Sequence, residues 1–239
     1  SIRLTSELGK KYNTSLLKRI RQYYLIIEKG ATMSHQLSWS HYCELLPLSS
    51  INRIDYYIDI SIKQNLSVRE LRNKIKNKEY ERIDETTKNK LMKNEDVDIS
   101  DFIKNPIIIK NCLNYNEISE KALKKLILED LDNFLKELGN GFCYIQNEYK
   151  IKIGDRYNYI DLLLYNIKYN CYVVIELKVT ELKKEYIGQI ETYMNYIDKN
   201  IKKINQDKTI GIIIVKRDNK FIMEYCSDNR IFSREFILK

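Results

Sequence analysis

The chain has 239 residues, of which 44% are hydrophobic and 31% charged, and its formal net charge is +8 at pH 7. It contains no run of about 18 uncharged apolar residues and no basic-then-apolar pattern at its start, so we expect a soluble cytoplasmic protein with no membrane partner. Because residue 1 is serine rather than methionine, we also expect the natural protein to begin upstream of it.

The positive charge is concentrated in the first third of the chain. Residues 1–80 hold 14 Lys and Arg against 7 Asp and Glu, and residues 81–239 hold 27 against 26, so the net charges are +7 and +1. A basic domain joined to a nearly neutral one with an acidic cluster is typical of a nucleic-acid anchor beside a metal-dependent site. The alternative is that the Lys-rich and Asn-rich composition reflects coding bias alone.

Apolar residues recur at helical spacing through the first 80 residues, which predicts an all-helical domain. The expected helices cover residues 14–29, 37–46, 49–64 and 67–80. The last begins with Ser67 and Glu70 in capping-box spacing. Trp39 and His41 are interpreted as structural. The basic side chains of this domain are candidate phosphate contacts, with a solvated helix face as the equal alternative. The candidates are Lys18, Arg19, Arg21, Arg69, Arg72 and Lys74.

Residues 81–110 are charged, Asn-rich and weakly periodic, so we expect a linker between a helical domain at 1–80 and a second domain at 111–239. The second domain begins with a helix over 118–138. Strand-like segments follow at 142–153, 157–165, 171–179, 209–216 and 221–226, with a helix at 184–198. This order predicts an α/β domain whose mixed central sheet is flanked by helices.

Two of these strands carry charged residues where a buried strand normally has none. Asp161 lies in the first arm of a predicted hairpin, and Glu176 and Lys178 lie in the second. A symmetric turn about residues 168 and 169 opposes Asp161 to Glu176, because both pairs of numbers sum to 337. Opposed side chains have Cβ atoms about 5 Å apart, where two carboxylates repel unless a cation lies between them. A divalent metal would remove this conflict.

This arrangement suits metal-assisted hydrolysis of a phosphodiester. Asp161 and Glu176 are hard oxygen ligands for Mg²⁺, and the backbone carbonyl of Leu177 is a third candidate ligand. Lys178, on the same face as Glu176, can orient or help deprotonate the attacking water and stabilise charge on the phosphate. The structural alternative is a buried ion pair between Glu176 and Lys178, with Asp161 at an edge.

Longer segments of the sequence resemble a known family. The segments LSWSHYCELL and NLSVRELRNKIKNKEYERI, then FLKELGNGFCYIQNEYKI, YIDLLLYN, CYVVIELK and EYIGQIETYMNYID, are similar to bacterial YhcG-type PD-(D/E)XK nucleases. The resemblance implies an α-helical N-terminal domain that binds DNA or serves assembly, followed by an α/β restriction-endonuclease-like domain. It also implies Mg²⁺, or alternatively Mn²⁺, as cofactor and DNA as substrate.

The resemblance assigns the family's D…ExK motif to Asp161, Glu176 and Lys178. It adds Gln189 from the helix after the motif as a catalytic residue, and Glu129 from the first core helix as a further metal ligand.

The chain departs from the family pattern at three places. Ile160 replaces the proline of the motif, and Lys184 stands where relatives often carry proline. Glu148 occupies a position expected to be basic or an amide, so it is an additional candidate ligand.

The sequence therefore predicts an Mg²⁺-dependent DNA endonuclease. One alternative is a DNA-binding or assembly protein that keeps the nuclease fold with little or no cleavage, and another is a nuclease directed at RNA. Cleavage of both strands of a duplex would favour a homodimer, because one active site per chain makes one nick at a time.

Overall fold

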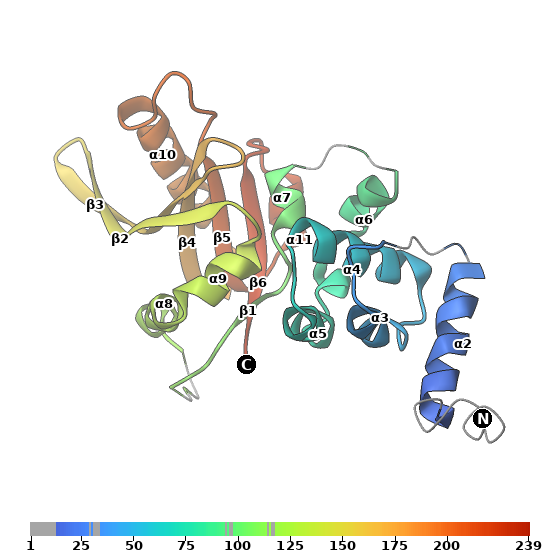
Figure 1. The fold of residues 1–239 in the computed structure, drawn as a ribbon. Helices are drawn as coiled ribbons and strands as arrows, with labels where there is room; N and C mark the ends of the chain where they lie inside the picture. The colour runs from blue at the N-terminus through green and yellow to red at the C-terminus, as the bar shows by residue number, and fades with distance from the viewer. Residues whose placement is uncertain are drawn as a thin grey trace. The chain divides into compact units, whose positions relative to one another are not determined.

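The computed structural model describes residues 13–28, 30, 34–93, 95, 98–113, 115 and 118–239. The chain divides into two compact units, Ser1–Arg82 and Ile83–Lys239 (Figure 1). The boundary lies two residues beyond the end expected for the helical domain. In the part of the chain that the structure describes, no helix combines the length and the apolar character needed to cross a membrane.

The first unit is helical, as predicted. Its elements are α2 (Thr14–Glu28), α3 (Trp39–Leu45), α4 (Ile51–Lys63), α5 (Val68–Lys76) and the 3₁₀ turn η1 (Tyr80–Arg82). Its core contains the buried side chains of Leu45, Tyr57 and Leu71, contributed by α3, α4 and α5. The predicted capping box is present, because the Ser67 hydroxyl accepts from the Glu70 amide and the Glu70 carboxylate accepts from the Ser67 amide.

The two candidate residues of the SWSHY segment have structural contacts. The Nε2 atom of His41 lies 3.0 Å from the Leu66 carbonyl oxygen, and its Nδ1 atom lies 2.8 Å from the Ser38 hydroxyl at the N-cap of α3. Trp39 packs edge-on against Tyr23 of α2, with ring centroids 5.4 Å apart. Both contacts agree with the structural interpretation of this segment.

The second unit is built on a six-stranded sheet in the order β1-β6-β5-β4-β3-β2. The strands β1, β6, β5 and β4 are parallel to one another, whereas β3 and β2 are antiparallel additions, so the sheet is mixed as predicted. The strands are β1 (Ile107–Ile109), β2 (Phe142–Ile153), β3 (Arg156–Asn166), β4 (Cys171–Glu181), β5 (Ile210–Arg217) and β6 (Ile231–Leu238).

Helices cover both faces of this sheet (Figure 1). The helices α8 (Glu120–Glu129) and α9 (Leu131–Leu138) pack on one face, where Leu126 and Phe134 join the core cluster of Leu162 and Ile175. The helix α10 (Lys184–Asn200) packs on the other face. Burial on both sides explains why the β4 and β5 sequences are almost continuously apolar.

The predicted hairpin register is confirmed. The structure pairs Leu162 with Ile175 and Asn166 with Cys171, and each pair of numbers sums to 337. The turn at 167–170 therefore lies where the symmetric arrangement requires it. The ladder ends at Leu162 and Ile175, so the predicted opposition of Asp161 to Glu176 lies one position beyond its last pair.

Residues 81–110, which were expected to form a linker, contain helices and a strand instead. The segment contains α6 (Glu85–Met92), α7 (Ile99–Phe102) and β1, and it belongs to the second compact unit. The strand β1 extends the sheet by pairing with β6. The charged composition of 81–110 concealed this role because only three consecutive isoleucines enter the sheet.

Two other expected elements also differ. The helix expected over 118–138 is two helices, which break at Asp130, where φ is −127° and ψ is 46°. The strand expected at 221–226 is instead the short helix α11 (Lys220–Glu224), which the Asn219 side chain caps by accepting from the Ile222 amide. A short apolar run does not distinguish a strand from a helix by periodicity alone.

The last strand, β6, lies where no strand was expected because Arg234 and Glu235 interrupt its apolar pattern. Arg234 is buried, and its guanidinium donates to the carbonyl oxygens of Ile103 and Ser100 at 3.1 and 3.0 Å. These acceptors compensate for burial of the charge, and they come from a segment about 130 residues earlier in the chain.

The close approach of α10 to β5 depends on the absence of a side chain at Gly211. A Cβ atom there would lie 2.6 Å from the Met194 Sδ atom and 2.8 Å from the Ile190 Cδ1 atom. We expect Gly211→Ala to destabilise the protein by about 1–3 kcal/mol, because the buried Met194 and Ile190 side chains, or the helix that carries them, must shift. Urea denaturation followed by circular dichroism measures this loss.

Gly188→Ala is the matched control, because a Cβ atom at this position of α10 meets no atom within 4 Å. It should leave stability unchanged or raise it by up to about 1 kcal/mol, since alanine is the better helix former. Equal stability of the two variants would contradict the packing explanation.

Candidate active site

Asp161 joins β3 to β4 through its side chain. Its Oδ2 atom accepts a hydrogen bond of 2.9 Å from the backbone amide of Leu177. The carboxylate thus extends the β3–β4 connection beyond the last backbone pair, Leu162 and Ile175. This bond fixes Asp161 beside the strand that carries the other two motif residues.

Glu176 is almost completely buried, with 2% of its surface exposed. Its Oε2 atom accepts from the Gln189 amide nitrogen at 3.2 Å and lies 3.4 Å from the Lys178 ammonium nitrogen. Within the described part of the chain, its Oε1 atom has no hydrogen-bond partner. One oxygen of this carboxylate is therefore held by the protein, and the other is available to a ligand.

Burial and the nearby Asp161 carboxylate raise the pKa of Glu176 to about 8. When no cation is bound, the Glu176 carboxyl therefore keeps its proton to a higher pH than an exposed glutamate does. This behaviour is typical of a carboxyl group that lacks a countercharge in a low-dielectric environment.

Lys178 lies between acidic and aromatic groups. Its ammonium nitrogen is 3.7 Å from the Glu120 carboxylate and 5.2 Å from the centroid of the Tyr186 ring. Burial alone would lower the pKa of Lys178, but the negative charges of Glu176, Glu120 and Asp161 outweigh it and raise the pKa. Lys178 is thus a cation in this state, which suits charge stabilisation better than proton abstraction.

Lys124 of α8 is a member of the site that the sequence did not single out. Its ammonium nitrogen lies 2.6 Å from the Asp161 carboxylate and 3.2 Å from the Glu148 carboxylate. Glu120, one helical turn earlier, contacts Lys178. One face of α8 therefore contributes a cation and an acid to the carboxylate cluster, and Glu148 also joins it.

Gln189 is brought to the site, as the family resemblance implied. Its amide nitrogen donates to Glu176 and also lies 3.1 Å from the Tyr193 hydroxyl, one turn further along α10. The sequence alone gave no reason to single out Tyr193.

Glu129 is not brought to the site. It ends α8, its side chain is 37% exposed, and its nearest ion-pair partner is Lys125 at 3.8 Å. At 100° per residue, Glu129 lies about 140° around the helix from Lys124, which faces Asp161. The acid that α8 directs toward the motif is Glu120 instead.

The basic residues predicted to contact nucleic acid have varied surroundings in the first unit. Arg72 forms two hydrogen bonds with Glu44, at 2.7 and 3.1 Å, and Lys74 pairs with Glu79 at 3.0 Å. Arg19 lies 3.9 Å from the Cys43 sulfur. The remaining candidates are exposed at the helix surface: Lys18, Arg21 and Arg69.

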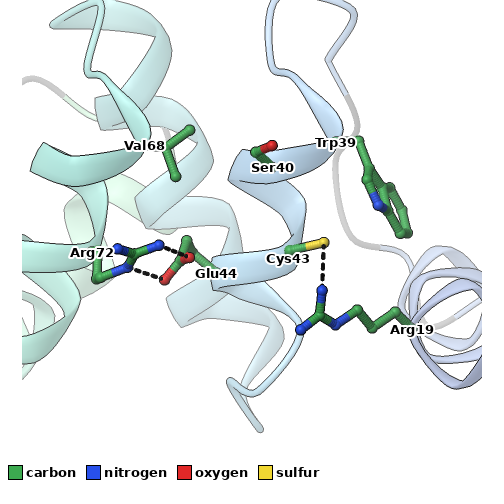
Figure 2. Close-up of a pocket in the computed structure, with 7 residues that line it drawn as sticks. All are labelled: Arg19, Trp39, Ser40, Cys43, Glu44, Val68 and Arg72. Atoms are coloured by element: carbon green, nitrogen blue, oxygen red, sulfur yellow. Dashed lines mark hydrogen bonds and ion pairs between the residues drawn. The ribbon is translucent and has the colours of Figure 1, made fainter. Parts of the chain in front are cut away.

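Arg19 and Arg72 line opposite sides of a shallow pocket of about 490 Å³ between α2, α3 and α5 (Figure 2). The Glu44 carboxylate between them is engaged by Arg72, and Trp39 stands beside Arg19. The pocket therefore offers less free positive charge than its two arginines suggest.

The mixed sheet and a matching family model define the second unit as a nuclease domain of the PDDEXK class. The chain belongs to the YhcG PDDEXK nuclease family, whose domain model matches residues 100–236. A second model, the DUF1016 N-terminal domain, matches residues 1–82.

The relatives are distant. The chain is 23% identical over 187 residues to the Escherichia coli (strain K12) protein named "Putative nuclease YhcG", an alignment that covers 76% of this chain and 50% of that protein. The chain thus spans about half the length of this relative. A repair endonuclease from Pyrococcus abyssi aligns with a TM-score of 0.37 and 20% identity, over 51% of this chain and 48% of that one. An EndoMS–dsDNA complex aligns with a TM-score of 0.38 and 19% identity, over 51% of this chain and 47% of that one.

The raised pKa of Glu176 makes the stability of the metal-free protein depend on pH. Ionisation of Glu176 costs nothing below its ordinary pKa of 4.5, and the cost grows until the pH exceeds about 8. We therefore expect Glu176→Gln to match the wild type near pH 4.5 and to be more stable by a few kcal/mol at pH 9. Urea unfolding in EDTA at both pH values measures the difference.

Glu129→Gln serves as the control, because it removes an exposed carboxylate. A similar pH-dependent gain in this variant would attribute the effect to overall charge. An equal gain in stability at both pH values in Glu176→Gln would contradict a raised pKa of the buried Glu176 carboxyl group.

Proposed function

We propose that this chain is a metal-dependent endonuclease that hydrolyses DNA through Asp161, Glu176 and Lys178, with Mg²⁺ as the natural cofactor and Mn²⁺ as a substitute. The observation that carries the proposal is the buried Oε1 atom of Glu176, which has no hydrogen-bond partner among the described residues and lies close to a second carboxylate. A buried unsatisfied carboxylate oxygen is costly, and a bound cation would remove the cost.

The residues present fit a magnesium ion. Asp161 and Glu176 supply oxygen ligands, and the amide of Leu177 points toward Asp161. Because the N–H and C=O groups of a strand residue point to the same side, the Leu177 carbonyl is directed to that side as well. No three His, Cys, Asp or Glu side chains gather into a metal-binding group within the described ranges, so water would complete the shell, as Mg²⁺ commonly allows.

A bound divalent ion supplies Lewis-acid stabilisation and lowers the pKa of a coordinated water. The chain's own residues do the remaining work. Gln189 holds the Oε2 atom of Glu176, so that the Oε1 atom would remain available to the ion. Lys178 presents a cation that orients the attacking water and offsets the negative charge that develops on the phosphate.

The helical unit is proposed to hold the DNA, with Lys18, Arg21 and Arg69 as phosphate contacts because these side chains are exposed. Arg19, Arg72 and Lys74 stay in the proposal as weaker candidates, since each already contacts a protein group. Cleavage of both strands would require two active sites, which a homodimer supplies.

The proposal predicts that Glu176→Ala and Asp161→Ala each lower the cleavage rate by roughly 100-fold or more, because each removes a ligand that offsets transition-state charge. Labelled duplex DNA, single-stranded DNA and RNA, incubated with Mg²⁺, Mn²⁺ or EDTA and resolved on denaturing gels, provide the measurement. Lys178→Ala should have a similar effect on cleavage with metal-ion affinity largely retained.

Glu129→Ala is the matched control, an acid on α8 that lies away from the motif, and it should cleave like the wild type. Undiminished cleavage by Glu176→Ala would refute the assignment. Tight, salt-sensitive DNA binding without any nicking would identify a binding or assembly protein, and cleavage confined to RNA would identify the other alternative.

The ion pair between Lys124 and Asp161 predicts competition with the metal. Lys124→Met keeps the length of the side chain but frees the Asp161 carboxylate, so we expect Mn²⁺ to bind on the order of fivefold more tightly, equivalent to about 1 kcal/mol. Electron paramagnetic resonance of free Mn²⁺ measures this without catalysis.

Lys125→Met is the control, because it removes the same charge from the adjacent position, which pairs with Glu129. Unchanged or weaker Mn²⁺ binding by Lys124→Met would show that Lys124 does not compete for Asp161.

A further inference from the structure

Next to the active site, β2 and β3 continue as a two-stranded ribbon. The β3–β4 ladder runs only from Asn166 to Leu162, whereas β3 stays paired with β2 as far as Arg156. Figure 1 shows this ribbon, in yellow, extending past the other strands. Among the described strands, β2 alone pairs with residues 156–160, so the other edge of β3 has no strand partner there.

The two faces of the ribbon differ in character. Ile151 and Ile160 are 1% and 0% exposed and join the core cluster under α10, so the inner face anchors the ribbon to the domain. The outer face carries two lysines and two tyrosines, all exposed. These four residues, called the ribbon face below, are Lys150, Lys152, Tyr157 and Tyr159.

The ribbon face is continuous with the active site. Alternation places Tyr157 and Tyr159 on the face opposite Ile160, but it breaks at Asp161, because Ile160 joins the core cluster under α10 and Leu162 the cluster under α8 and α9, and Glu148 of β2 has a φ of 47°. The link to the active site is the Lys124 side chain, whose ammonium nitrogen contacts both Glu148, two residues before Lys150, and Asp161, two residues after Tyr159. A line of cations therefore runs from Lys124 outward along the ribbon.

The lysines of the ribbon face are held in place by an aromatic ring. The ammonium nitrogen of Lys150 lies 3.8 Å from the centroid of the Tyr157 ring, and that of Lys152 lies 5.9 Å from it. A lysine already fixed on a ring loses less rotamer freedom when it binds an anion. Residues 149–159 carry three basic side chains and one acidic side chain, so the ribbon is positively charged overall.

We propose that the ribbon face binds the phosphodiester backbone of DNA immediately beside the scissile phosphate. The inference rests on the proposed endonuclease function and states where its substrate lies. At about 3.4 Å per strand residue, Lys150 and Lys152 lie about 7 and 14 Å from the rung of Asp161. These distances equal roughly two and four nucleotides of rise along a DNA strand. The lysines neutralise phosphates there, and the tyrosine hydroxyls donate hydrogen bonds to them.

The test measures binding in the absence of cleavage. The full chain and the double variant Lys150→Ala/Lys152→Ala are titrated in EDTA against a fluorescent DNA duplex, and anisotropy is followed from 0.05 to 0.3 M salt, a range chosen around physiological ionic strength. Loss of two phosphate contacts should reduce the slope of log K against log salt concentration by about 1.8 in magnitude. It should also weaken binding roughly thirtyfold near 0.15 M salt. Lys150→Arg/Lys152→Arg should keep both values near those of the wild type.

The matched control is Lys168→Ala/Lys203→Ala, which removes two exposed lysines near the opposite end of β3. Lys168 also lies over a tyrosine, with its ammonium nitrogen 5.2 Å from the Tyr169 centroid, so its chemistry is comparable. This variant should bind DNA within about twofold of the wild type, because its lysines lie away from the proposed contact.

Wild-type affinity in Lys150→Ala/Lys152→Ala, or an equal loss in both double variants, would overturn the proposal. Preferential loss of RNA binding with DNA binding intact would also overturn it, since it would place a different nucleic acid on the ribbon. The outcome is separable from the proposed function. Absence of metal-dependent cleavage refutes the endonuclease assignment whether or not the ribbon binds DNA. Cleavage by the wild type, together with wild-type DNA affinity in Lys150→Ala/Lys152→Ala, refutes only the ribbon contact.

Discussion

The central constraint in this structure is a carboxylate placed inside a sheet. Glu176 lies in β4 between two layers of helices, with 2% of its surface exposed, and burial together with Asp161 raises its pKa to about 8. A hydrophobic side chain at this position would make a more stable sheet. The contacts around Glu176 secure its Oε2 atom and leave its Oε1 atom without a hydrogen-bond partner among the residues that the structure describes, which is the basis of the proposed metal site.

The neighbouring strand and helices position the groups that surround the buried Glu176 carboxylate. The β3–β4 ladder ends at Leu162 and Ile175, and the amide of Leu177 then anchors the Asp161 carboxylate just beyond it. The helix α10 supplies Gln189, and its approach to the sheet requires a glycine in β5 at position 211. The packing that stabilises the second unit is therefore the same packing that sets the geometry of its carboxylates.

The sequence predicted the parts of this site that depend on strand periodicity. Charged residues interrupting two apolar runs singled out Asp161 and Glu176, and a symmetric turn was enough to obtain the register of the hairpin from residues 162 and 175 to its turn. Lys124 could not be found in this way, because it is one of several lysines on α8, and only the tertiary contact distinguishes it. Glu129 was favoured over Glu120 by family resemblance, whereas the phase of the helix directs Glu120 to Lys178. Likewise β6 contains a buried arginine whose acceptors are distant in sequence, so periodicity could not identify it.

Electrostatics links the site to its proposed substrate surface. The carboxylates of Asp161 and Glu176 would repel a phosphate at short range, yet the proposed nuclease must bring a phosphate to them. Lys124 offsets the charges of Asp161 and Glu148 at the edge where β2 and β3 leave the sheet. Beyond that edge the outer face of the ribbon carries only exposed lysines and tyrosines up to its turn. In the proposed complex, a polyanion lying along the ribbon would meet positive charge before it reached the carboxylates, and the proposed cation, together with Lys178, would make the final approach favourable.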